Sequence, residues 1–433
     1  MKAKAVRLVI RPFLVVIKYV LLVVFSLALL LYLNSYWYEF HTTERFKGNI
    51  LYNPYQHVQF NRGMMSNFHS HSECWNALTN GKGSEDEVKQ TYRNMGYDLY
   101  ELSNYHRLDH AGRNNLQTYE HGWGFLKAHQ LVIGGSNVTW LDFPLVQNAN
   151  QKQTILNRLN QANSDALIVI AHPSLRGAYS QEDIISLTGF HCLEVINKLK
   201  KSKKLWDDVL SGGKYIPAMG GDDCHNIFKN LDIGRCGNYV LTSNPAPAAV
   251  KGALRNGRSL IVEFDPTADA AIDAKRELIQ KPMPIKGIQC AKDTITFTAH
   301  ESLRSVLVIT DYSDTLYSAH DVNGLSFVLP ESSSFVRFEW ITIDGRHIYS
   351  NPIARTEKGS FPMQQSAFIL PFKTMFYRLL LVVGICILWY PSLILLYVFI
   401  AKKISGRPKW GKPNRRAFPP FAWRFRNIAG TGK

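Results

Sequence analysis

The sequence predicts an α/β fold with a barrel-like α/β domain over residues 60–265, a small antiparallel β-sandwich over 285–355, and two flanking transmembrane helices. Three observations predict it. Short apolar strands alternate with amphipathic helices from about residue 60 to 265. Strand-like runs separated by turn signals follow from 285 to 353. Two apolar stretches of bilayer length lie near the two chain ends.

The first apolar stretch covers residues 13–33, with Lys18 near its edge, and follows a basic end at 1–12. The second covers 379–400, carries no charge and contains Pro391, which predicts a kink. Each is long enough to span a bilayer, and Lys18 can reach the head groups. A cleavable signal peptide is the alternative for the first stretch. The segment Tyr36-Trp37-Tyr38 resembles an interfacial aromatic belt rather than a cleavage site, so we expect an uncleaved anchor.

The net charge of +16 belongs to the chain ends. Residues 1–18 and 373–433 hold 17 of the 50 basic residues and no acid, so the middle is close to neutral. Because basic residues favour the cytoplasmic side, we expect a two-pass protein of the cytoplasmic membrane with both termini in the cytoplasm. Residues ~40–370 then lie outside it, in the periplasm of a Gram-negative cell. The basic, aromatic tail at 401–433 suits anionic lipid, and no nucleic-acid partner is expected.

Residues 60–265 contain seven strand-like runs with helices between them. The expected strands are 98–103, 131–134, 166–171, 192–197, 215–219, 237–241 and 259–263. Two helices are expected at 85–95 and 247–256, because Gly96 and Gly257 follow them where a helix-ending glycine is favoured. This alternation favours a parallel, barrel-like sheet. From 285 to 353, Asn323-Gly324 and Asp344-Gly345 predict the hairpin turns of the β-sandwich.

Histidines and acidic residues gather where strands are expected to end. In chain order they are His69, His71, Glu120, His129, His172, Asp223 and His225. Side chains at the C-terminal ends of strands in α/β folds converge on one site. Histidines two residues apart on a strand share a face and can hold one ion. Because imidazole and carboxylate ligands together suit zinc, manganese or iron, the sequence predicts a multinuclear metal centre.

The order of these motifs resembles the polymerase and histidinol phosphatase (PHP) superfamily of metal-dependent hydrolases. The resemblance covers residues 60–265 and rests on His-x-His, Ser-Asn-Tyr-His, the glutamate, the next histidine, His-Pro and Asp-x-His. The segments 338–346 and 350–353 resemble the appended domain of the CehA/McbA branch. The resemblance implies a distorted (β/α)7-type PHP barrel and a metal-dependent hydrolase.

The resemblance also implies how the ligands are shared. The first metal would be held by His69, His71, Glu120 and Asp223. The second would be held by Glu120, His129 and His172. His225 would serve a third metal in members that have one.

Two positions depart from the family pattern at the third metal. Asn76 stands where the family usually has an aspartate, and Ser103-Asn104-Tyr105-His106 stands where it usually has Thr-Asp-His. An amide is a poorer ligand than a carboxylate, so we expect two divalent metals and a weak or absent third. His106 is a candidate ligand or substrate contact. Arg176, four residues after His172, is a candidate phosphate clamp; an exposed structural arginine is the alternative.

The leading hypothesis is a membrane-anchored phosphoesterase that acts on a small-molecule or lipid-linked phosphoester through metal-activated water. One alternative is a hydrolase of carboxylic or carbamate esters. Another is a degenerate PHP domain that serves as a metal-dependent binding or scaffold module. Asn76 and Asn104 favour the degenerate domain, whereas the seven intact ligands argue against it.

Overall fold

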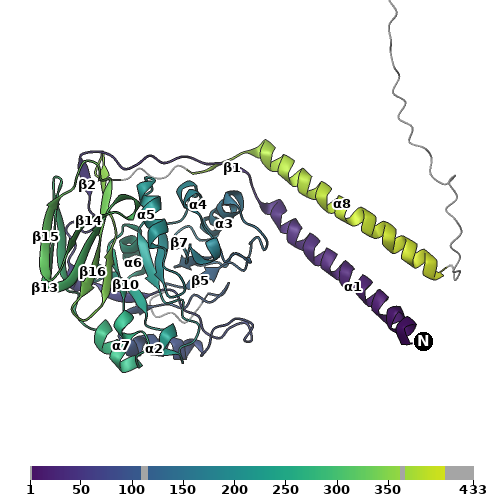
Figure 1. Cartoon of the computed structure of the whole chain (residues 1–433), viewed down its shortest axis with the longest axis horizontal. Coiled ribbons are helices and arrows are strands. Elements are labelled where there is room, and N and C mark those ends of the chain that lie inside the picture. The colour runs from purple at the N-terminus through teal and green to yellow at the C-terminus, as the bar shows by residue number, and fades with distance from the viewer. Residues whose placement is uncertain (1, 109–115, 361–365, 405–433) are drawn as a thin grey trace, which may run out of the picture. The chain divides into compact units, whose positions relative to one another are not determined.

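The computed structural model describes residues 2–108, 116–360 and 366–404, and their side chains except those of 2–12, 266 and 402–404. The chain is a mixed α/β protein with several sheets and two long apolar helices, which confirms the predicted class at this level (Figure 1). The basic tail expected at 401–433 lies, beyond residue 404, outside the described residues.

A five-stranded sheet contains five consecutive strands of the chain. They are β5 (Thr118–His121), β6 (Gln130–Ile133), β7 (Leu167–Ile170), β8 (Cys192–Asn197) and β9 (Ala218–Gly221). The pairs β7–β8 and β8–β9 are parallel, but β5–β6 and β6–β7 are antiparallel. The expected all-parallel arrangement is therefore wrong. Only residues 122–129 join β5 to β6, and a parallel crossover needs about a dozen residues or more.

The other large sheet has twelve strands and continues across the expected boundary between residues 265 and 285. Its main path is β12 (Ile285–Ala291), β13 (Thr294–Ile309), β16 (Phe335–Thr342), β17 (His347–Ser350), β11 (Ser259–Glu263), β10 (Cys236–Val240), β3 (Met64–Asn67) and β4 (Leu99–Tyr100). The remaining strands are β2 (Ile50–Tyr52), β14 (Thr315–Ala319), β15 (Val322–Val328) and β18 (Ile353–Thr356). Antiparallel pairing of β17 with β11 joins the strands of 285–355 to those of 60–265.

The two sheets meet at β9 and β10 without a backbone ladder. The Asn238 side chain on β10 connects them by two hydrogen bonds to the backbone of β9. Its Oδ1 accepts the Gly220 N–H at 2.8 Å, and its Nδ2 donates to the Gly220 carbonyl oxygen at 2.7 Å. Among the described residues, strand pairing therefore does not close the two sheets into one ring.

Helices cover the five-stranded sheet on both faces, and its strands are buried at every position. Val132, Ile168 and Ile170 pack with α3 (Ala149–Ala162), α4 (Gln181–Ser186) and α5 (Lys203–Ser211). Their strand neighbours Leu131 and Val169 face the other way and pack with α6 (Pro247–Arg255). The helices α2 (Glu85–Met95) and α7 (Ile272–Ile279) join the core of the twelve-stranded sheet.

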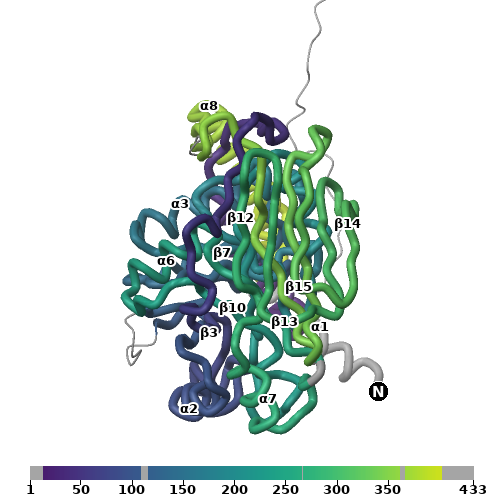
Figure 2. The backbone as a smooth tube through the Cα atoms, turned by 90° about the vertical axis from the view of Figure 1, so that its left-hand side faces the viewer, coloured from purple at the N-terminus to yellow at the C-terminus, as the bar shows by residue number. Residues whose placement is uncertain are grey.

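The strands of 285–355 are antiparallel, and β13 organises them. It pairs with β12 and β15 along its first half and with β14 and β16 along its second (Figure 2). Asp344-Gly345 lies in the turn between β16 and β17, as expected. The turn expected at Asn323-Gly324 is wrong, because Gly324 lies inside β15 and pairs with Thr298. The hairpin turns earlier, at Asp321, which has a left-handed φ of 53°.

Two helices are long and apolar enough to cross a membrane. α1 (Lys2–Leu31) contributes to the apolar segment Phe13–Asn34, and α8 (Pro371–Ile404) contains the segment Pro371–Ala401. The chain segments next to these helices are paired, since β1 (Tyr38–Glu39) forms an antiparallel ladder with β19 (Phe368–Ile369).

Candidate metal centre

All seven predicted ligands converge at the ends of β3, β5, β6, β7 and β9, where they form overlapping groups of three whose ligand atoms lie within 4.8 Å of one another. The groups are His69–His71–Glu120, Glu120–His129–His172, His69–His172–Asp223 and His71–Asp223–His225. The backbones of His172 and Asp223 are left-handed, with φ of 29° and 49°. Non-glycine residues in this region are strained, and such strain gathers at functional sites.

Glu120 lies at the middle of the cluster and faces histidines with both of its oxygens. Its Oε2 is 3.1 Å from His71 Nε2 and 3.6 Å from His69 Nε2. Its Oε1 is 2.5 Å from His129 Nδ1 and 3.2 Å from His172 Nε2. The side chain is completely buried. A carboxylate with two imidazoles at each oxygen is arranged to bridge two cations.

Four buried atoms in the cluster face one another without a hydrogen-bond partner. They are His69 Nε2, His71 Nε2, Glu120 Oε2 and Asp223 Oδ1. Asp223 Oδ1 is 3.3 Å from His69 Nε2 and 3.4 Å from His71 Nε2. Leaving buried polar atoms unpaired costs free energy, so native structures rarely do so without a reason. A divalent cation held by these nitrogen and oxygen atoms would satisfy all four, and the donor set fits zinc, manganese or iron.

The charges of the cluster reinforce this fit. Burial alone would lower the pKa of His69, but the Glu194, Asp223 and Glu120 carboxylates raise it well above its ordinary value. Burial would raise the pKa of Glu120, but the surrounding histidines lower it well below its usual range. The pKa of Asp223 is lowered in the same way. Both carboxylates therefore stay ionised and attract positive charge.

Glu194 on β8 orients two residues of the cluster, His69 and His172. Its Oε1 lies 2.7 Å from His69 Nδ1, and its Oε2 accepts the His172 backbone N–H at 2.9 Å and the Asn197 amide at 3.0 Å. The contact to Nδ1 directs His69 Nε2 toward Glu120 and Asp223. Position at a strand end was the only sequence signal for Glu194, and it does not separate this role from ordinary core polarity.

We predict that Glu194→Ala lowers metal affinity by about 10–100-fold, the scale of losing a contact that orients a metal-binding histidine. Glu194→Gln keeps an oxygen that can accept from His69 Nδ1, so it should lose less. Competition of each variant with a chromophoric chelator measures the affinity. An unchanged affinity in Glu194→Ala would contradict the orienting role.

The third group is the least complete. His71, Asp223 and His225 share two members with the other groups. Asn104 does not join them: its Oδ1 accepts the Ser72 N–H at 2.9 Å and its Nδ2 donates to Ser72 Oγ at 2.8 Å. Asn76 is exposed. Neither amide therefore supplies a ligand to this group, and the expectation of two metals with a weak or absent third stays a prediction.

His106 lies outside the ligand groups of the described residues, and its candidate role as a substrate contact stays a prediction. Its Nδ1 lies 3.0 Å from the Thr139 carbonyl oxygen, and its Nε2 accepts the Gly122 N–H at 3.1 Å. Burial lowers the pKa of His106 to about 4, so the ring stays neutral near pH 7. Both nitrogens are engaged by backbone groups, and His106 is absent from the clustered ligand atoms of the described residues. Its two hydrogen bonds connect the loops that contain Gly122 and Thr139 near the site.

Tyr105 occupies the place that His106 was expected to take. Its ring stacks on His71 with centroids 4.6 Å apart, and its hydroxyl lies 3.4 Å from His225 Nε2. The Lys127 ammonium lies 5.8 Å from the centre of the same ring. The one-residue displacement of the histidine was the sequence signal for Tyr105. Lys127 had no such signal.

Arg176 is exposed and does not contact the cluster. Its guanidinium donates to the Phe125 carbonyl oxygen at 3.1 Å and lies 5.7 Å from the centre of the Phe125 ring. Phe125 and Lys127 belong to the same link between Glu120 and His129. Arg176 and Lys127 are thus two cations on or beside this link, and Arg176 remains a candidate for binding substrate.

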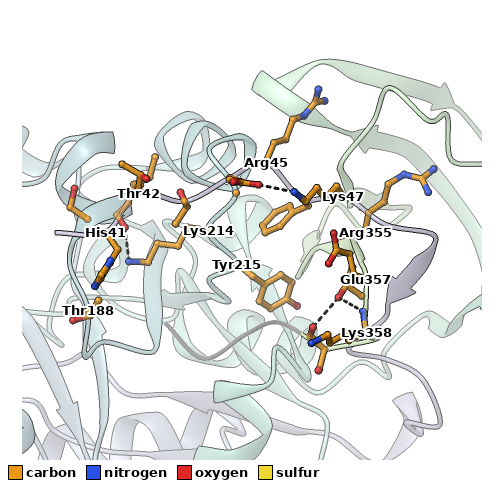
Figure 3. Close-up of a pocket in the computed structure, with 18 residues that line it drawn as sticks. His41, Thr42, Arg45, Lys47, Thr188, Lys214, Tyr215, Arg355, Glu357 and Lys358 are labelled. Atoms are coloured by element: carbon orange, nitrogen blue, oxygen red, sulfur yellow. Dashed lines mark hydrogen bonds and ion pairs between the residues drawn. The ribbon is translucent and has the colours of Figure 1, made fainter. Parts of the chain in front are cut away.

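A cavity of about 700 Å³ lies apart from the cluster, and none of the seven ligands lines it (Figure 3). Two of the cations that line it have partners: Lys47 pairs with Glu44 at 2.7 Å, and Lys214 donates to backbone carbonyl oxygens, including that of Ile184 at 2.6 Å. The candidate functional site is therefore the ligand cluster and not this cavity.

Asp222 and His121, which neighbour the ligands in sequence, have ordinary hydrogen-bonding roles. Asp222 accepts from the Tyr92 hydroxyl at 2.8 Å and from three backbone N–H groups. His121 contacts the Gln130 side chain and the Leu141 carbonyl oxygen.

Comparison of the chain with protein-family models, curated proteins and solved structures gives no match. The proposed metal centre therefore rests on the geometry of the ligand groups.

Proposed function

We propose that this chain is a membrane-anchored, metal-dependent hydrolase of the PHP type, with a phosphoester as the favoured substrate. The observation that carries the proposal is the bridging position of Glu120. It lies between two histidine groups, beside buried ligand atoms that have no hydrogen-bond partner. Two divalent ions would be held by His69, His71, Glu120 and Asp223 and by Glu120, His129 and His172.

Divalent ions in such a centre lower the pKa of water and stabilise negative charge on phosphoryl oxygens. The protein groups around it suit an anionic substrate. Lys127 and Arg176 place two cations on or beside the link between Glu120 and His129. Asp223 and Glu120 stay ionised and hold the positive charge in place. An ester of phosphate fits this balance better than an uncharged ester.

The membrane placement is supported by composition and by two helices. One apolar segment of 22 residues runs through α1 and η1, and another of 31 residues lies in α8. The basic residues gather at the outer ends of these helices, which favours cytoplasmic termini and a metal centre on the opposite side of the cytoplasmic membrane.

The test uses the full chain, purified in detergent and reloaded with manganese, zinc or iron. We expect about two metal ions per chain by mass spectrometry and turnover of phosphoesters in a screen that also includes carboxylic and carbamate esters. His69→Ala/His71→Ala should lose metal and turnover. The control is His300→Ala/His320→Ala, which removes two exposed histidines from the β-domain and should keep both.

Three results separate the hypotheses. Turnover of carboxylic or carbamate esters alone would show that the substrate is one of these esters and not a phosphoester. Bound metal without turnover of any ester would favour the metal-dependent binding module. A reloaded chain without bound metal would overturn the proposal.

A further inference from the structure

Large apolar side chains are exposed on three loops beside the metal centre. They are Trp75, Trp123, Phe125, Trp140, Leu145 and Val146, and we call them the aromatic rim. Each is between 40% and 73% exposed. Exposed apolar side chains that gather in one place, as these do, mark a surface for a partner or a membrane.

Contacts among the loops make the rim one continuous surface. The rings of Trp75 and Trp140 pack edge to face with centroids 5.7 Å apart. The Trp123 indole N–H points to the Trp140 carbonyl oxygen at 3.4 Å. The Phe125 backbone N–H donates to the Pro144 carbonyl oxygen at 3.1 Å, next to Leu145. The three loops therefore hold one another in place.

The rim adjoins the metal centre through Tyr105, whose ring stacks on His71. Trp75 follows His71 by four residues and donates from its indole to the Tyr105 carbonyl oxygen at 2.8 Å. Trp123 follows Glu120 by three residues. Arg176, whose guanidinium lies over the Phe125 ring, adds an exposed cation to the rim.

The same loops contact the end of the first apolar helix. η1 (Tyr32–Asn34) directly follows α1, and the Tyr32 hydroxyl donates to the Val146 carbonyl oxygen at 2.9 Å. The Leu145 N–H donates to the same hydroxyl at 3.0 Å, and the Tyr32 ring packs against Phe143. The rim thus begins where the apolar segment of α1 ends.

A buried carboxylate fixes this arrangement. Asp142 is completely buried and accepts the N–H groups of Trp123 at 2.6 Å and Gly124 at 2.8 Å, as well as the Gln147 amide at 2.7 Å. The rim is therefore held both to the helix end and to the strand that carries Glu120.

We propose that the aromatic rim inserts into the interface of the extracytoplasmic leaflet beside α1, and that the metal centre takes its phosphoester from the lipids of that leaflet. Tryptophan favours the bilayer interface because its ring is apolar and its N–H is polar. Arg176 complements a lipid phosphate. Insertion rests on α1 spanning the membrane, and the choice of substrate rests on the proposed hydrolase function.

Insertion is measured without reference to activity. The full chain with Cys290→Ser/Cys386→Ser and Phe125→Cys is labelled with bimane and placed in nanodiscs that contain nitroxide-labelled lipids. The control label is at Ser318→Cys, an exposed position on β14. We expect strong quenching at Phe125→Cys and little at Ser318→Cys. Equal quenching at the two positions would overturn insertion.

The substrate class is measured with two carboxylates placed in the rim. Leu145→Asp/Val146→Asp should lower turnover of phospholipid in nanodiscs by about tenfold or more and leave turnover of p-nitrophenyl phosphate unchanged, because neither side chain contacts Arg176 or the ligand groups. The control, Val328→Asp/Ile343→Asp, adds the same charge at exposed apolar positions of the β-domain and should change neither.

The two measurements separate the failures. Phospholipid turnover unaffected by the rim carboxylates would overturn lateral supply from the leaflet, whatever the fate of the hydrolase proposal. Turnover of soluble esters with no turnover of any phospholipid would overturn the lipid substrate and leave the hydrolase intact. Absence of all turnover would sink the proposed function and the lipid substrate with it, while the quenching experiment still decides insertion.

Discussion

Glu120→Gln is expected to release both metal ions and to lower the hydrolytic rate by roughly 10²–10³-fold or more, the scale of removing a group that stabilises charge at an active centre. Glu120 is the only residue shared by the two groups His69–His71–Glu120 and Glu120–His129–His172. An amide keeps the shape of the side chain but supplies one neutral oxygen in place of two charged ones. Metal content by mass spectrometry and turnover of the reloaded chain measure the two effects.

The matched control is Glu339→Gln. Glu339 is a largely buried carboxylate held by cations, with Arg337 at 2.7 Å and Lys203 at 2.8 Å, but it lies on β16 away from the ligand cluster. Its metal content and turnover should stay at the wild-type level. Full metal occupancy in folded Glu120→Gln would show that the carboxylate does not bridge the ions.

Asp207→Ala is expected to cause the largest loss of stability, about 3–5 kcal/mol, because it removes two of the hydrogen bonds of a buried guanidinium and leaves Glu339 as its remaining carboxylate partner. Asp207 on α5 accepts from Arg337 on β16 at 2.6 and 2.8 Å, and both side chains are almost fully buried. This pair links the helix layer over the five-stranded sheet to the β-strands of 285–355. Urea denaturation of the detergent-solubilised chain measures the loss.

Asp208→Ala provides the comparison on the same helix. Asp208 pairs with the exposed Lys204 at 2.9 Å, and such surface pairs contribute less than about 1 kcal/mol. Asp207→Leu/Arg337→Met removes both buried charges and should recover much of the stability lost by Asp207→Ala. Similar losses for Asp207→Ala and Asp208→Ala would refute the account of the buried pair.

The ligands were predictable from sequence because each obeys a local rule. The His69–His71 spacing places two side chains on one strand face, and strand ends place the others nearby. Tyr105 was not predictable in this way. A stacking tyrosine has no ligand chemistry, and its position beside His71 is set by the fold, in which its backbone forms a bridge with Glu120.

The strand positions were also local, whereas their pairing was not. Each of the seven expected strands overlaps a strand of the structure, but β3 and β5 were not expected; Gly96 indicated the end of α2. Nothing in these runs distinguishes antiparallel β6–β7 from parallel β7–β8, since all three strands are mainly apolar and are buried on both faces. The Asn238 contact to Gly220 joins residues that are not neighbours in sequence, and only the folded chain reveals it.

The pairing of β1 with β19 has a consequence for synthesis. Tyr38 pairs with Ile369, and Leu51 of β2 pairs with Arg355 of β18. β1 and β2 can therefore pair only after β19 and β18 have been synthesised. Contacts between such distant residues form slowly because a long loop must close first. During translation β1 and β2 therefore remain unpaired strand edges until β18 and β19 have been synthesised, and the nascent chain exposes these edges throughout that interval.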